Sequence, residues 1–157
     1  MPNDFNANDI FEMAVKIEQN GAIFYRNAAK QVKGEQHKEF LLGLAKMEDN
    51  HETTFANMQK GLKDQESFST TFDPDDENAL YLKALADTRI FFKKEQPGKS
   101  LKSILGCAIQ AEKDSIAFYL GIKELVPPKL GQSKIDDIIK EEMSHIRLLA
   151  GKLTEYY

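Results

Sequence analysis

The sequence predicts an all-α fold, a four-helix bundle with one long crossover connection that contains a short helix. Four long segments carry apolar residues at the three- and four-residue steps that place them on one helix face. Residues of the same kinds recur at an offset of 94 residues, as in Phe24-Tyr25 and Phe118-Tyr119, so the chain contains two similar halves. No segment alternates like a strand for long, and we therefore expect no sheet.

The first half is expected to form two long helices joined by a short turn. The first helix covers about residues 8–33, and Gly34 is a suitable residue to end it. The second covers about residues 35–62 and has its own apolar stripe. Helices joined by a short turn pack antiparallel, so this half predicts a helical hairpin.

The second half repeats this arrangement after a longer connection. Residues 63–76 contain Asp, Ser, Thr and one Pro and are typical of a loop, and residues 77–92 carry a short helical pattern. Ser100 can cap a third long helix over about 101–125. Two prolines and a glycine separate it from a fourth helix over about 134–156. The connection between the two hairpins is long enough to cross the bundle.

Composition narrows the class of protein. A chain of 157 residues fits one domain of ordinary size, which we expect to span residues 1–157. The net charge is −4 and the 21 basic residues are spread along the chain, which argues against a nucleic-acid surface. No apolar run approaches the roughly 20 residues of a membrane span. Cys107 is the one cysteine and the N-terminus is unlike a leader peptide, so we expect a cytoplasmic protein.

A pattern of glutamates and histidines is the most informative feature of the chain. In each half a glutamate is followed 30 residues later by a second glutamate and, three residues further on, by a histidine. The two glutamates of each half lie equally far from the turn between their helices, so folding the hairpin brings their carboxylates to one level. A glutamate and a histidine three residues apart share a helix face and can reach the same ion. The six residues are Glu18, Glu48, His51, Glu112, Glu142 and His145.

The chemistry of these residues points to bound metal. All four glutamates stand where the helical period calls for an apolar residue. Buried carboxylates are costly, and four at one level would repel one another, whereas two divalent cations would cancel their charge. A single Glu-x-x-His is usually a surface or structural feature, but two inward-facing copies with two further glutamates predict a dinuclear site in a four-helix bundle. A structural bundle whose acids are protonated or bonded to water is the alternative.

The segments around these residues resemble the di-iron domain of rubrerythrin, a family of the ferritin-like superfamily. The resemblance covers nearly the whole chain and is carried by residues 17–25, 47–51, 111–119 and 141–145. It implies a ferritin-like bundle that binds two iron ions through the six residues, with Glu48 and Glu142 bridging the ions. Glu18 and Glu112 would be terminal ligands. Manganese or zinc would fit the same ligands.

The resemblance also implies a function. Members of this family typically reduce hydrogen peroxide or oxidise ferrous iron, so we expect an oxidoreductase that reacts with hydrogen peroxide or oxygen. The alternative is a protein that stores, buffers or senses iron without rapid turnover. Typical members carry a rubredoxin domain with two Cys-x-x-Cys pairs. With Cys107 alone, this chain would need a separate electron-donor protein. Ferritin-like bundles often pair, so a homodimer is compatible with the sequence, although no apolar stripe demands one.

Two tyrosines and one missing carboxylate complete the sequence pattern. Tyr25 and Tyr119 each lie seven residues after a predicted ligand glutamate, and they either hydrogen-bond a ligand carboxylate or fill the core. Rubrerythrins carry a second carboxylate near the ligand of the third long helix, which lets one iron shift between ligands. The positions one turn from Glu112 hold Ala108, Ile109 and Ser115 instead. This difference argues against such a shift here.

Overall fold

The structure is a computed structural model that describes residues 7–63, 77–88, 100–126 and 128–155. No strand occurs among these residues, as the sequence predicts. The helices are α1 (Ala7–Gln31), α2 (Glu35–Lys63), α3 (Glu77–Thr88), α4 (Leu101–Leu125), the short 3-10 helix η2 (Pro128–Leu130) and α5 (Gln132–Thr154).

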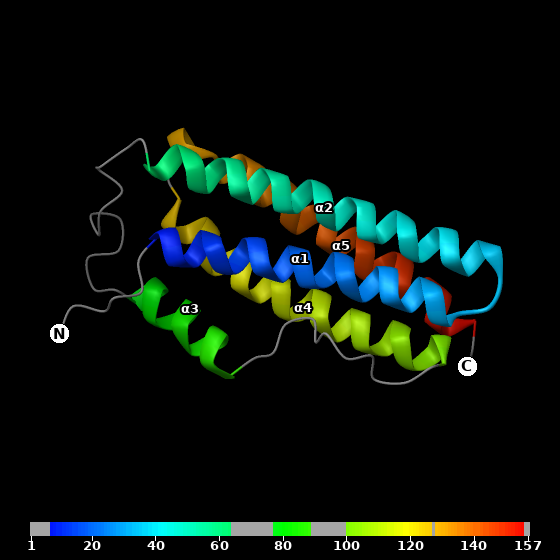
Figure 1. Ribbon diagram of the computed structural model, residues 1–157. Helices are drawn as coiled ribbons and strands as arrows, with labels where there is room; N and C mark the ends of the chain where they lie inside the picture. The colour runs from blue at the N-terminus through cyan, green and yellow to red at the C-terminus, as the bar shows by residue number, and fades with distance from the viewer. Residues whose placement is uncertain (1–6, 64–76, 89–99, 127, 156–157) are drawn as a thin grey trace.

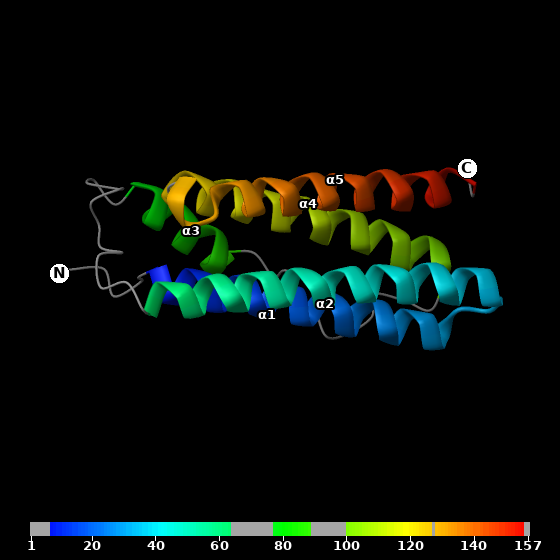
Figure 2. The same ribbon diagram turned by 90° about the horizontal axis from the view of Figure 1, so that it is seen from above.

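The four long helices form two hairpins that pack face to face. α1 lies antiparallel along α2, and α4 lies antiparallel along α5 (Figure 1). The view from above separates the two hairpins into two layers (Figure 2). α2 and α4 run in the same direction, so the chain must return along the bundle between them. The predicted topology with one long crossover containing a short helix is therefore confirmed.

Local chemistry explains where several helices begin and end. Ser100 caps α4, because its side-chain oxygen accepts a hydrogen bond from the backbone N–H of Ser103 at 3.1 Å. Gly34 and Gly131 both adopt positive φ angles, of 100° and 104°, which only glycine tolerates without strain. Gly131 also precedes α5 directly, so this helix begins at Gln132.

The observed helix bounds differ by about two residues from the predicted ones. α1 ends two residues before the predicted end of its helix, and α5 begins and ends two residues earlier than 134–156. Helix ends are the least certain part of a sequence-based assignment. The described part of the short helix ends at residue 88. The predicted residues 89–92 and most of the predicted loop, residues 64–76, lie outside the described residues.

The short helix α3 packs against α4 at a glycine. Leu82 of α3 is fully buried, and a Cβ atom added at Gly121 would lie 2.6 Å from its Cδ2 atom. The Tyr81 hydroxyl donates a hydrogen bond to the carbonyl of Ala117 at 3.1 Å. The missing side chain at Gly121 thus provides the space in which α3 is seated.

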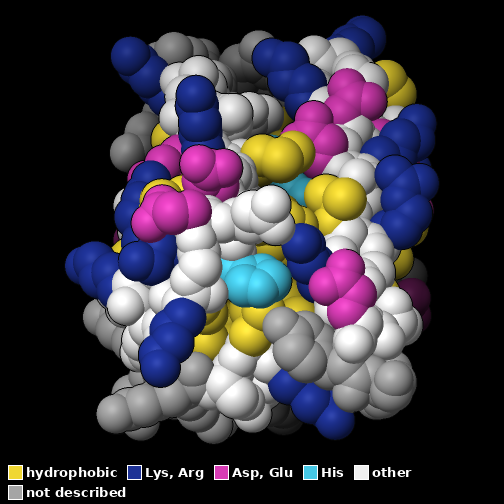
Figure 3. Space-filling view, turned by 90° about the vertical axis from the view of Figure 1, so that its right-hand side faces the viewer, with side chains coloured by type: hydrophobic (Ala, Val, Ile, Leu, Met, Phe, Trp, Pro, Cys, Tyr) yellow, Lys and Arg dark blue, Asp and Glu magenta, His cyan; other side chains and the backbone are white. Residues whose placement is uncertain are grey.

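One end of the bundle has a surface of mixed charge. On the end of the bundle that carries the turn between α1 and α2, basic and acidic side chains are interspersed around smaller groups of hydrophobic ones (Figure 3). Among the described helices, none combines the length and the apolar character that a membrane crossing requires.

Between the hairpins the interior is apolar along most of its length. It is interrupted where the six predicted ligand residues meet.

Candidate metal centre

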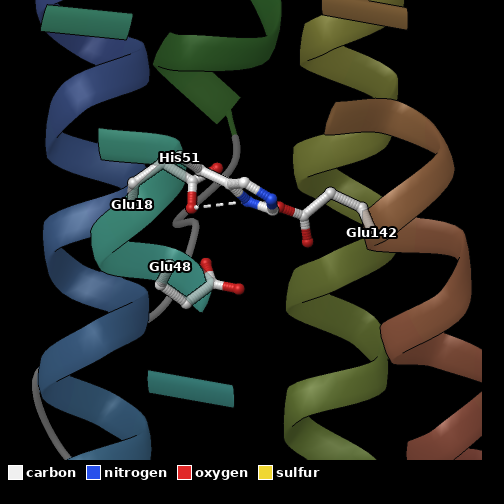
Figure 4. Close-up of side chains that lie close together, drawn as sticks. All are labelled: Glu18, Glu48, His51 and Glu142. Atoms are coloured by element: carbon white, nitrogen blue, oxygen red, sulfur yellow. Dashed lines mark hydrogen bonds and ion pairs between the residues drawn. The ribbon is translucent and has the colours of Figure 1, made fainter. Parts of the chain in front are cut away.

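The structure brings all six predicted ligand residues together inside the bundle. One glutamate comes from α1 and one from α4, while α2 and α5 each supply a glutamate and a histidine. All six side chains are buried, and none is more than 3% exposed. Figure 4 shows Glu18 and Glu142 approaching His51 from opposite hairpins, with Glu48 below them. The spacing in the sequence therefore corresponds to a common level in space.

The ligand atoms fall into two groups that share two members. Glu18, Glu48, His51 and Glu142 form one group, and Glu48, Glu112, Glu142 and His145 form the other. Within each group, one donor atom from every residue lies within 4.8 Å of all the others. The shared residues are Glu48 and Glu142, the pair that the family resemblance assigns as bridging. Two neighbouring ions could thus be held with these two carboxylates between them.

Both histidines turn the same ring nitrogen toward the carboxylates. His51 Nδ1 lies 2.8 Å from Glu142 Oε1 and 3.5 Å from Glu18 Oε2. His145 Nδ1 lies 3.2 Å from Glu48 Oε1, 3.3 Å from Glu112 Oε1 and 3.4 Å from Glu142 Oε2. The two rings are nearly parallel, with centroids 5.8 Å apart. Each Nδ1 atom is therefore placed as one donor of a metal site.

The two tyrosines named in the sequence reach carboxylates across the bundle. The Tyr25 hydroxyl donates to Glu112 Oε1 at 2.6 Å, and the Tyr119 hydroxyl donates to Glu18 Oε1 at 2.5 Å. Both tyrosines are fully buried. Each hydroxyl thereby holds one oxygen of a glutamate on the opposite hairpin. The other oxygen of Glu18 lies 3.5 Å from His51 Nδ1, and the other oxygen of Glu112 is buried without a hydrogen-bond partner.

Two contacts of the histidines were not predicted from the sequence. His51 Nε2 lies 2.5 Å from Glu141 Oε2, and His145 Nε2 lies 3.4 Å from the sulfur of Met47. Each partner directly precedes one of the shared glutamates. The helical stripe gave no signal for Glu141, whose side chain is 51% exposed. Aligning the two halves at the 94-residue offset places Glu141 opposite Met47, and this difference between the halves is the signal in the sequence that could have identified Glu141.

The electrostatics of the cluster follow from its burial. Burial and the charges of Glu142 and Glu18 raise the pKa of Glu48 well above its usual value. Burial and the charges of Glu112 and Glu18 do the same to the pKa of Glu142. Burial also raises the pKa of Glu112, but its hydrogen bonds with Glu142 and His145 outweigh this and lower it. Glu48 and Glu142 therefore resist ionisation without a compensating cation.

The pKa values of the two histidines are also raised, which for a histidine favours the charged form. Burial lowers the pKa of His51, but its close contacts with the carboxylates of Glu142 and Glu18 outweigh burial and raise it to about 11. Burial likewise lowers the pKa of His145, and its close contacts with the carboxylates of Glu112 and Glu142 outweigh burial and raise it to about 9. Without metal, each histidine would carry a positive charge in the midst of the acids.

The donor set fits a pair of metal ions. One oxygen of each of the four glutamates is buried without a hydrogen-bond partner, although histidine nitrogens lie nearby; these atoms are Glu18 Oε2, Glu48 Oε1, Glu112 Oε2 and Glu142 Oε2. Buried acceptors of this kind are rare unless something else binds them. Four free carboxylate oxygens and two imidazole nitrogens suit iron, manganese or zinc better than calcium or magnesium.

The structure also shows what stands near Glu112, where the sequence lacks a second carboxylate. Ser115, one turn after Glu112, is buried, and its hydroxyl donates to the carbonyl of Ala111 at 2.9 Å. Its side chain is thus engaged with its own helix. No acidic side chain stands one turn from Glu112 on either side.

Two of three comparisons with known proteins agree with this geometry. Comparison with curated proteins gives no significant match. A crystal structure from Thermotoga maritima, of a protein provisionally described as ferritin-like and diiron-carboxylate, matches with a TM-score of 0.69 and 26% sequence identity, covering 97% of each chain. Residues 9–153 match the family model described as rubrerythrin. Because this match covers nearly the whole chain, the protein belongs to the rubrerythrin family.

Proposed function

We propose that the buried cluster binds two iron ions and carries out redox chemistry with hydrogen peroxide or oxygen, of the peroxidase or ferroxidase type. The observation that carries this proposal is the pair of donor groups that share Glu48 and Glu142. Membership of the rubrerythrin family and the likeness to a protein described as diiron-carboxylate support iron as the metal. Two ferrous ions bound there would supply the two electrons that reduce peroxide or oxygen.

The residues of the chain have separate parts in this proposal. Glu48 and Glu142 would bridge the two ions, and Glu18 and Glu112 would each bind one ion through the oxygen that its tyrosine partner leaves free. The tyrosine hydroxyls hold the other oxygen of these two glutamates and so fix the direction of the free one. Second hydrogen bonds of this kind orient metal ligands in proteins generally.

The histidines complete the ligand set. His51 and His145 would bind through Nδ1, the atom that faces the carboxylates. Binding requires the neutral imidazole, so loading the site releases a proton from each ring. Burial excludes water from the cluster and strengthens the interaction between the carboxylates and the ions. For turnover with peroxide, we propose a separate electron-donor protein in the cytoplasm as the source of electrons.

Anaerobic reconstitution tests the proposal. Metal-free protein is loaded with two equivalents of ferrous iron and mixed with either hydrogen peroxide or oxygen, while the near-ultraviolet absorbance of the ferric product is followed. Faster oxidation by peroxide supports a peroxidase, and faster oxidation by oxygen supports a ferroxidase. Iron that binds stoichiometrically but is oxidised no faster than free iron would favour storage, buffering or sensing. Failure to bind iron would leave a structural bundle.

A further inference from the structure

The two halves of the centre differ in what lies behind each histidine. The glutamates, histidines and tyrosines of one half all have counterparts 94 residues later, and their contacts mirror one another. The residue before each shared glutamate breaks this symmetry, because it is Met47 in one half and Glu141 in the other. Each of these side chains contacts the Nε2 atom of the histidine on the opposite hairpin. The asymmetry is therefore built into the contacts of the two metal-facing rings.

The contact of His51 is of the kind that fixes a ring for metal binding. Carboxylate oxygens act as hydrogen-bond acceptors, so the short contact with Glu141 favours the tautomer that carries the proton on Nε2. That tautomer leaves Nδ1, which faces Glu18 and Glu142, with its lone pair available to an ion. Glu141 reaches this buried ring from the surface, where its side chain is half exposed.

His145 has a weaker partner at the same atom. A thioether sulfur is a poor hydrogen-bond acceptor, and Met47 approaches Nε2 at 3.4 Å. The ring is fully buried, so bulk water does not replace the thioether there. The tautomer and orientation of His145 are consequently less strongly held than those of His51. The carboxylate also increases the electron density on the ring of His51, which the thioether does not do for His145.

We propose that Glu141 is a positioning residue for His51 and makes the two metal positions unequal. The position formed by Glu18, Glu48, His51 and Glu142 is the tighter one and is filled first. The position that contains His145 is the weaker one. The inference rests on the proposed function only in requiring that the cluster binds two ions. Loss of an outer partner of a metal-bound histidine typically costs about 10–100-fold in metal affinity, which sets the expected difference between the positions.

Anaerobic titration of the metal-free protein with Co(II) tests this inference. Stepwise dissociation constants come from calorimetry, and the visible cobalt spectrum reports the environment of each ion. The wild type should show two steps that differ about 10–100-fold. Glu141→Met should weaken the first step until the two agree within about threefold, with two ions still bound. Met47→Glu should narrow the difference by strengthening the second step instead.

Further variants identify the positions and control for charge. His51→Ala should abolish the tight step and His145→Ala the weak one. Glu39→Met, which removes an exposed glutamate elsewhere on α2, should leave both constants unchanged. Glu141→Gln, which retains a neutral acceptor, should weaken the first step less than Glu141→Met.

The outcomes separate this inference from the proposed function. A wild type with two equal steps, or a Glu141→Met variant with wild-type constants and a wild-type spectrum, would overturn the inference and leave a two-metal centre standing. A wild type that binds no cobalt and no iron would overturn both.

Discussion

The hydrogen bond from Tyr119 to Glu18 offers a direct test of how the cluster is held together. Both side chains are fully buried, and the hydroxyl oxygen lies 2.5 Å from the carboxylate. Tyr119→Phe removes only the hydroxyl and keeps the ring packed against Phe55, whose ring centroid lies 4.9 Å away. The carboxylate oxygen then loses its donor in a place that water does not reach. The change therefore isolates one buried bond to an acid.

The size of the effect follows from the partners. A hydrogen bond to a charged group contributes about 1.5–3 kcal/mol, and a buried acceptor left without a donor incurs a desolvation cost of similar size. For a chain of this length, 1 kcal/mol corresponds to about 2–4 °C in Tm. We therefore expect Tyr119→Phe to lower the free energy of unfolding by about 1.5–3 kcal/mol and the Tm by about 3–12 °C. Tyr25→Phe should have an effect of similar size, because its bond to Glu112 is 2.6 Å long and equally buried.

Urea unfolding of the metal-free protein, followed by circular dichroism, measures this difference. The matched control is Tyr81→Phe, which removes a hydroxyl that donates to the backbone carbonyl of Ala117 at the surface. Water can replace that bond, so the control should remain within about 0.5 kcal/mol of wild type. The reasoning is refuted if Tyr119→Phe is as stable as the Tyr81→Phe control.

Three further changes test other parts of the structure. Glu48→Ala should lower bound iron from two ions per chain toward one or none by elemental analysis, because Glu48 belongs to both donor groups; unchanged stoichiometry would refute its bridging role. Gly121→Ala should loosen the packing of α3, because the added methyl group would lie 2.6 Å from Leu82. Limited proteolysis should then cut this variant near α3 faster than it cuts the control Gly106→Ala, in which the methyl group meets open space. The Tm gap between metal-loaded and metal-free protein should widen from about pH 6 to about pH 8, and a constant gap in thermal scans would contradict this. The sign follows from the pKa of His145, which is raised to about 9 in the folded metal-free protein, whereas the usual histidine pKa is near 6.5. Between these two values the folded metal-free protein binds more protons than the unfolded chain. The stability of the metal-free protein therefore falls as pH rises through this range.

The convergence of the six candidate ligands could be predicted because the four acids among them violate the apolar period of their own helices. An acid at an inward position needs compensation, and the equal spacing around the two turns places all four acids at one level. The helices themselves were predictable for the same reason, since their apolar stripes are long and regular. The exact ends of α1 and α5 were not, because the last turn of a helix depends on local capping rather than on periodicity.

The contacts of the side chains around the ligands could not be read from one helix. Tyr25 lies seven residues after Glu18, which is about 10 Å along the helix and too far for a hydrogen bond. It reaches Glu112 on the opposite hairpin instead. Sequence spacing indicated that a tyrosine stood near the cluster, but only the packing of the two hairpins determines which carboxylate it meets. The same holds for Glu141, which contacts a histidine 90 residues away.

The raised pKa values of the histidines suggest how the bundle tolerates its acids before metal arrives. In the metal-free protein, a protonated His51 would place one positive charge between Glu18 and Glu142, and a protonated His145 would place another near Glu112. Two imidazolium charges would thus compensate part of the negative charge that two divalent ions would otherwise cancel. Metal loading would then exchange protons for cations within a bundle that is already folded. On this reasoning the metal-free chain remains helical and takes up metal more readily as pH rises, in contrast to small domains whose folding depends on the metal itself.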